Sequence, residues 1–110
     1  MYLYINYFGD LKMFDVVDSA YDRLFLLKDN ITSLNIGTLN QELDSFIRED
    51  ERDIILDLEE VNKIDSVSLA FLIRIKKRLD ETDRVFKMIN LSEPVHRVLV
   101  LTGVEAFLTE

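Results

Sequence analysis

Cysteine is absent from this 110-residue chain, which excludes disulfide bonds, thiol nucleophiles and thiolate-bound metal sites. Its absence also fits a reducing compartment. No apolar run approaches the ~20 residues that a helix needs to cross a bilayer. The apolar start of the chain, MYLYINYFGD, lacks the basic residues and the small-residue cleavage site of a signal peptide. We therefore expect a cytoplasmic protein with no direct insertion into a membrane.

Glycine and proline are scarce, with three residues and one residue, so turns are few and compact and no glycine-rich loop can cradle a phosphate. Positive charge is also in the minority, because 13 Lys+Arg face 21 Asp+Glu for a net charge of −8. Such a chain repels polyanions, so we expect no nucleic-acid partner. One basic cluster lies inside a helical pattern and is interpreted as a solvated helix face: Arg74, Lys76, Lys77 and Arg78.

The length predicts one domain, and apolar periodicity divides it into alternating strands and helices. We expect strands at residues 13–19, 23–28, 52–61 and 84–91, the first two as a hairpin. We expect helices at residues 33–50, 66–80 and 92–103, followed by a short strand or turn at 104–110. The apolar run Ile54, Ile55, Leu56 is typical of a central strand in a parallel sheet.

All three expected helices carry apolar residues at helical spacing, which in residues 33–50 are Ile36, Leu39, Leu43, Phe46 and Ile47. In residues 66–80 the predicted core stripe is Leu69, Leu72, Ile73 and Leu79. Phe71 and Ile75 lie off that stripe, so we expect them to be partly exposed. In residues 92–103 the predicted buried face is Val95, Val98, Leu99 and Thr102.

The first residues form a separate N-terminal extension, residues 1–12, before the domain at 13–110. Their aromatic and aliphatic side chains fall on both faces of a strand pattern. This favours either an added edge strand or a segment that packs on another molecule, including a second copy of the chain in a homodimer. Met13 is an alternative start, which would make the extension dispensable.

The order of the elements predicts an α/β fold, with right-handed crossovers between parallel strands. Functional residues of such sheets gather at the carboxyl ends of the strands. Residues 62–66 and residues 28–33 each follow a strand and precede a helix, so we expect both at the same edge. Asp65 and Ser66 then stand side by side at that edge.

The pair Asp65–Ser66 allows several interpretations. Ser66 is a common N-cap residue, and a cap stabilises a helix by about 1 kcal/mol. A serine nucleophile needs a nearby base, yet His96 is the sole histidine and no G-x-S-x-G turn surrounds Ser66. Glu59 and Glu60 are conceivable metal ligands, although adjacent acids at a strand end more often face water. We expect no metal and no cofactor.

Four motifs occur in order along the second half of the chain: LDL at 56–58, Asp65-Ser66, SEPV at 92–95 and LTGV at 101–104. In this order and spacing the chain resembles the STAS domain of bacterial anti-sigma factor antagonists, over roughly residues 13–109. The resemblance implies a single STAS-like domain with a mixed, mostly parallel sheet of four to five strands and three to four helices. The chain departs from the family where Val67 and Ser68 follow the Asp-Ser pair.

The resemblance implies that Ser66 is a regulatory phosphorylation site, with Ser68 as a second hydroxyl nearby, and that the domain catalyses nothing. Without phosphate it would bind an anti-sigma factor that is also a serine kinase and so free a sigma factor. Phosphorylation would end that binding, and a serine phosphatase would restore it. The partner-binding residues implied are Asn30, Thr32, Ser33, Asn62, Lys63, Asp65, Val67 and Ser68.

A different STAS role is the alternative. The chain would then be a subunit of a lipid transporter or of a stress-sensing assembly, and Ser66 need not be phosphorylated.

Overall fold

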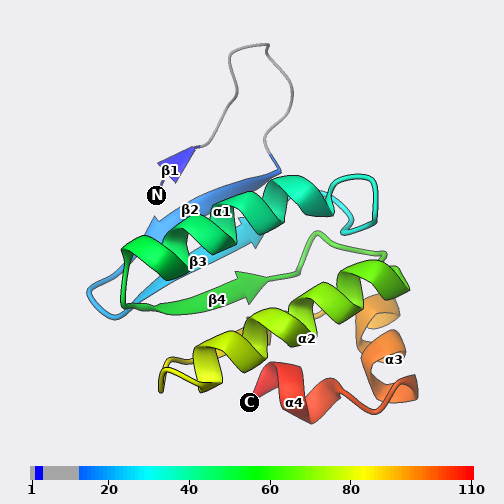
Figure 1. Cartoon of the computed structure of the whole chain (residues 1–110). Helices are drawn as coiled ribbons and strands as arrows, with labels where there is room; N and C mark the ends of the chain where they lie inside the picture. Colours follow the sequence, from blue (N-terminus) through cyan, green and yellow to red (C-terminus); the bar gives the residue numbers. More distant parts are fainter. Residues whose placement is uncertain (1, 4–12) are drawn as a thin grey trace.

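The computed structural model describes residues 2, 3 and 13–110 of the chain (Figure 1). Its strands are β1 (Tyr2–Leu3), β2 (Phe14–Asp18), β3 (Asp22–Leu27), β4 (Asp53–Asp57) and β5 (Phe86–Ile89). Its helices are α1 (Ile36–Glu49), α2 (Ser66–Asp80), α3 (Glu93–Leu101) and α4 (Glu105–Thr109). The predicted extension at 1–12 contributes β1, and its other residues lie outside the part of the chain that is described.

The strands form one mixed sheet in the order β1-β2-β3-β4-β5. β2 and β3 form the predicted antiparallel hairpin, and β1 joins β2 antiparallel. β4 lies between β3 and β5 and is parallel to both, which confirms the predicted central strand. One row of side chains crosses four strands, because Val16 pairs with Phe25, Phe25 with Leu56, and Leu56 with Met88. All members of this row are buried.

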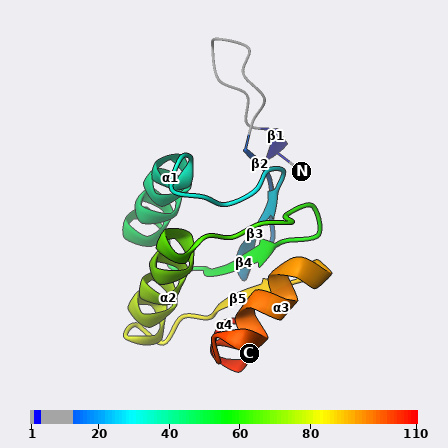
Figure 2. The ribbon, with the colours of Figure 1, turned by 90° about the vertical axis from the view of Figure 1, so that its right-hand side faces the viewer.

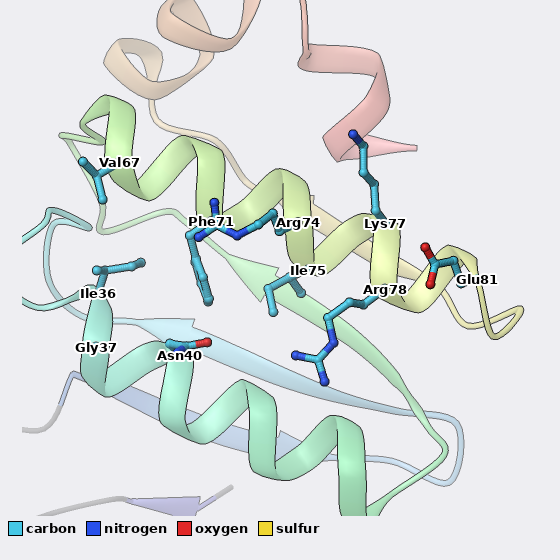
Figure 3. A pocket seen from close by; sticks show the side chains of 10 residues that line it. All are labelled: Ile36, Gly37, Asn40, Val67, Phe71, Arg74, Ile75, Lys77, Arg78 and Glu81. Atoms are coloured by element: carbon cyan, nitrogen blue, oxygen red, sulfur yellow. The ribbon is translucent and has the colours of Figure 1, made fainter.

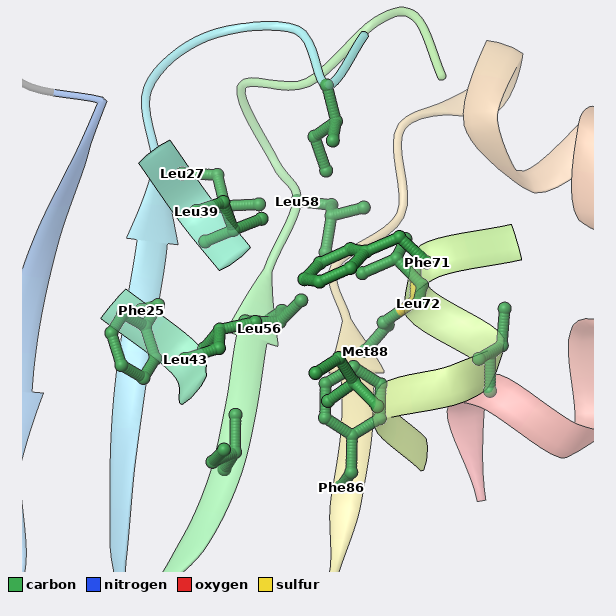
Figure 4. Close-up of a cluster of buried hydrophobic side chains, with 14 of the residues drawn as sticks. Phe25, Leu27, Leu39, Leu43, Leu56, Leu58, Phe71, Leu72, Phe86 and Met88 are labelled. Atoms are coloured by element: carbon green, nitrogen blue, oxygen red, sulfur yellow. The ribbon is translucent and has the colours of Figure 1, made fainter. Parts of the chain in front are cut away.

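Helices α1 and α2 lie side by side on the face of the sheet to which this row points (Figure 2). The buried side chains of both helices and of the strands fill the space between the two layers (Figure 4). Helix α4 packs on both β5 and α2, so it closes the β5 end of the molecule. The predicted α/β fold with a mixed sheet is therefore confirmed.

The prediction that Phe71 and Ile75 are partly exposed is wrong. Both are buried, with 5% and 2% of their surface accessible. Helix α2 contacts α1, β5 and α4 at once, so its apolar sector is wider than a single stripe. Thr102 departs in the other direction: it is exposed beyond the end of α3, and its hydroxyl donates to the backbone oxygen of Val98 at 2.7 Å.

The C-terminal segment is a helix and not the predicted strand or turn. Gly103 has φ +75°, a conformation that other residues rarely adopt, and it separates α3 from α4. Val104 and Leu108 then lie four residues apart on the side of α4 that packs inward, where Leu108 is fully buried. Five helical residues are too few for this spacing to stand out in the sequence.

Lys76 corrects the interpretation of the basic cluster as a solvated face. The residue is only 9% exposed. Its ammonium pairs with Asp80 at 3.3 Å, donates to the backbone oxygen of Glu110 at 3.3 Å, and lies over the ring of Phe107. Helix α4 therefore covers this lysine, whereas Arg74 and Lys77 remain exposed.

Candidate functional site

Two loops meet at the carboxyl ends of β3 and β4. Ile31 of the first loop and Ile64 of the second form a parallel bridge, and the amide of Ile31 donates to the carbonyl of Lys63 at 3.0 Å. Both isoleucines are buried, so the bridge extends the core beneath the loops. The prediction that residues 28–33 and 62–66 share one edge of the sheet is confirmed.

Asn30 ties the two loops together from the first loop. Its side-chain oxygen accepts hydrogen bonds from the amides of Asn62, at 2.9 Å, and Lys63, at 3.1 Å. The side chain of Asn35 in turn donates to the carbonyl of Asn30 at 2.6 Å, and it accepts from the amide of Thr32. These bonds fix the backbone of both loops before any partner arrives.

Asp65 makes the corresponding link from the second loop. One carboxylate oxygen accepts from the amide of Ser68 at 2.9 Å, and the other accepts from the amide of Ser33 at 2.7 Å. The backbone amides of Ser68 and then of Ser33 favour the charged form and lower the pKa of Asp65 to about 2. Asp65 is therefore the N-cap of α2, and the hypothesis that Ser66 is the cap is wrong.

Ser66 is the first residue of α2, and it is exposed. Since Asp65 engages the amide of Ser68, the amides of Ser66 and Val67 are the ones left at this helix end. Neither donates to an acceptor anywhere in the described part of the chain. An accessible hydroxyl thus stands beside two free N–H groups, at the end of the helix that favours negative charge.

Apolar side chains flank this hydroxyl on the exposed surface. Val67 is 53% exposed, and Leu34, in the loop that Asp65 holds, is 96% exposed. The sequence analysis missed Leu34. The available signal was an apolar residue placed among the polar residues of a loop, between Ser33 and Asn35.

The predicted partner-binding residues do not all reach the surface. Ser33, Asn62, Lys63, Ser66 and Val67 are exposed, and together with Leu34 they are called the loop surface below. Asn30, Thr32 and Asp65 are half-buried and hold the loops in place. Ser68 is fully buried, so its hydroxyl is shielded and lies outside the loop surface.

Two of the residues weighed for catalysis or metal binding, His96 and Glu60, are engaged elsewhere. His96 of α3 contacts the carboxylate of Glu105 in α4 through its Nε2 atom. Glu60 pairs with Lys28 at 2.9 Å. Within residues 13–110 there is no group of three or more His, Asp or Glu side chains placed to hold a metal ion. The same part of the chain has no helix with the length and apolar character needed to cross a membrane.

A search of curated sequences found no match. Among solved structures, the fold is similar to that of a Thermotoga maritima protein described as a proposed anti-sigma factor antagonist, with a TM-score of 0.79 and 22% sequence identity. The likeness covers 88% of this chain and 84% of the other, and it concerns the fold. A family model, that of the STAS domain, matches residues 12–109. Since that match takes in nearly the whole of the sheet and every helix, the chain belongs to the STAS domain family.

Proposed function

We propose that this protein is an anti-sigma factor antagonist, a non-catalytic binding module that is switched off by phosphorylation at Ser66. Its partner is an anti-sigma factor that is also a serine kinase. The observation that carries the proposal is the exposed hydroxyl of Ser66 at the first residue of α2, on a surface that two loops hold in place. The description of the structurally similar Thermotoga maritima protein supports the same function.

The geometry favours a switch that leaves the fold unchanged. A phosphate adds about −1.5 to −2 charges. The amides of Ser66 and Val67 donate to no acceptor within the described residues, so they are free to bind the phosphate oxygens at the positive end of α2. Asp65 beside it keeps its own bonds to Ser33 and Ser68, because its low pKa leaves it charged. The domain therefore accepts the new charge locally.

The partner is affected far more than the domain. A kinase packed flush over the loop surface has to accommodate a dianion without water. Burying an unmatched charge costs several kcal/mol, and each 1.4 kcal/mol weakens binding tenfold. Phosphorylation thus releases the partner by local repulsion. Since the modified hydroxyl is exposed, a serine phosphatase in the same compartment can reach it and restore binding.

The test compares two variants at one position. We expect Ser66→Ala to bind the cognate anti-sigma factor kinase as the wild type does, and Ser66→Asp to bind at least tenfold more weakly by calorimetry. Incubation with the kinase and ATP should add one phosphate, which mass spectrometry places on Ser66, and the Ser66→Ala variant should gain none. Gln41→Glu, which adds a negative charge at an exposed position of α1, is the control and should bind normally.

Equal affinity of the Ser66→Asp and Ser66→Ala variants would contradict the proposal. A pull-down that recovers transporter ATPase subunits and no kinase would favour the alternative role as a structural STAS subunit.

A further inference from the structure

A groove runs between α1 and α2, beginning at the loop surface. Its volume is about 500 Å³. Ile36 and Asn40 of α1 form one wall, while Val67 and Phe71 of α2 form the other near Ser66 (Figure 3). Ile75 continues this wall toward the far end of α2. The groove is therefore continuous with the surface that carries the phosphorylation site.

The inner part of this groove is apolar. Figure 3 shows Phe71 and Ile75 pointing from α2 into the space between the two helices, with Ile36 opposite Val67 at the end nearest Ser66. Val67 is 53% exposed although it is a valine at the rim of a well-packed core. Phe71 and Ile75 are themselves only 5% and 2% exposed, so the accessible apolar surface of the groove comes mainly from Val67 and the half-buried Ile36. Contact with a partner would bury this surface, which is favourable by roughly 25 cal/mol per Å² of apolar surface.

The outer part of the groove is positively charged, in contrast to the protein as a whole. Most Lys and Arg side chains of residues 13–110 form ion pairs or hydrogen bonds, and the exceptions are Lys63, Arg74, Lys77 and Lys87. Arg74 and Lys77 line the groove, and Lys63 belongs to the loop surface. Glu81 is the one acid among the lining residues, at the far end. On a chain of net charge −8, this concentration of unpaired cations selects an acidic partner segment.

The groove also restricts the conformation of that segment. Both walls are helices, whose backbone groups are already hydrogen-bonded within the helix, so no sheet edge is offered to an extended strand. A segment that docks here has to satisfy its own backbone, as a helix does. From Val67 to Glu81 the groove spans about 21 Å along α2, which matches a helix of about 14 residues.

We propose that this groove binds an acidic amphipathic helix of the kinase that phosphorylates Ser66. The apolar face of that helix lies on Val67 and Ile36, above the buried Phe71, and its carboxylates face Arg74 and Lys77. This inference rests on the proposed function and deepens it, because it assigns the contact that holds the kinase beside the hydroxyl when no phosphate is present.

Charge reversal in the groove tests the proposal. The double variant Arg74→Glu/Lys77→Glu should weaken binding of the cognate kinase at least tenfold by calorimetry. The double variant Lys87→Glu/Arg97→Glu changes the net charge equally at positions outside the groove, and it should bind within twofold of the wild type. Thermal unfolding of both variants checks that each is folded. Equal binding by the two double variants would overturn the proposal.

The absence of native cysteine permits a second, independent readout. Asn40→Cys places a single thiol in the groove, and Gln41→Cys places one at the next exposed position of α1, outside the lining. Each is labelled with a photocrosslinker and irradiated with the kinase. The Asn40→Cys label should react with an acidic, amphipathic helical segment of the kinase, and the Gln41→Cys label should give far less product. A crosslink to a basic or an extended segment would contradict the assignment.

The outcomes separate this inference from the function on which it rests. If Ser66→Asp releases the kinase but the groove variant binds as the wild type does, the groove assignment fails and the proposed function stands. If neither change affects binding, the proposed function fails first.

Discussion

At the scale of single residues, one carboxylate organises the site. Asp65 accepts one bond within its own helix and one from the loop that leads to α1, so two segments more than thirty residues apart in sequence share a charged acceptor. Bonds from amides to a charged group are stronger than those between neutral groups. The consequence is a pH dependence that belongs to this side chain.

The pKa of Asp65 lies at about 2 in the folded protein, below the ordinary value of 3.8. A lowered pKa contributes stability that is fully present above the ordinary value and is lost as the pH falls through the folded value. We expect Asp65→Asn to lower the melting temperature at pH 7, where the wild-type carboxylate is charged. The difference between the two proteins should shrink between pH 4 and pH 2 in thermal unfolding monitored by circular dichroism.

A second residue-scale prediction concerns Ser66 itself. Because the side chain is exposed and lies at the positive end of α2, Ser66→Asp should change the free energy of unfolding by no more than about 0.5 kcal/mol. Urea denaturation of the wild type and the variant measures this. A large loss of stability would mean that weakened partner binding reflects unfolding, so Ser66→Asp could not then serve as a mimic of the switch.

Residue types alone did not distinguish Asp65 from Ser66 at the helix start. Serine and aspartate are both good N-caps, so the pair in sequence fits either register. The structure selects Asp65 because its second oxygen reaches Ser33 in another loop, a contact that no local pattern encodes. The placement of both loops at one edge was predictable, since it follows from strand direction alone.

At the scale of elements, helices α4 and α1 explain two departures from expectation. Helix α4 covers Lys76, which sequence pattern places on a solvated face, and α1 lies opposite Phe71 and Ile75, which are buried (Figure 3). Both effects are tertiary, so periodicity within α2 could not reveal them. The three long helices were predicted with ends displaced by at most three residues, as for the helix expected at 33–50 and found at Ile36–Glu49, whereas the strand expected at 52–61 already ends at Asp57.

Truncation of the side chain that anchors α4 should be costly. Leu108→Ala removes a fully buried side chain and should lower the free energy of unfolding by about 2–5 kcal/mol. Leu101→Ala is the matched control, because the same atoms are removed from a leucine that is 79% exposed, and the loss should stay within about 0.5 kcal/mol. Chemical denaturation compares the two, and similar losses would show that α4 contributes little to stability.

At the scale of the whole molecule, charge is distributed unevenly. The chain has a net charge of −8, yet three of the four unpaired cations of residues 13–110, Lys63, Arg74 and Lys77, lie on the loop surface or along the α1/α2 groove. The acidic composition predicts that nucleic acid is an unfavourable partner, but composition cannot show which few cations lack acidic neighbours. That information depends on which helices become adjacent after folding.

This uneven distribution predicts a salt dependence. Raising the ionic strength from 50 mM to 500 mM shortens the distance over which exposed charges attract each other, so the association rate of the wild type with the kinase should fall. The Arg74→Glu/Lys77→Glu variant lacks the attracting cations, and its rate should fall less or rise. Surface plasmon resonance at several salt concentrations measures both. Parallel salt profiles would indicate that the groove cations do not steer the encounter.

The bonds from Asn30, Asn35 and Asp65 have a consequence for the thermodynamics of recognition. A loop that is free in solution loses conformational entropy when a partner immobilises it, and that loss subtracts from affinity. Here the two loops already hold one shape, so docking requires little ordering on this side of the complex. If Ser66 is phosphorylated as proposed, the unmodified and the phosphorylated protein present nearly the same surface shape, and the partner discriminates between them by charge and not by a change of conformation.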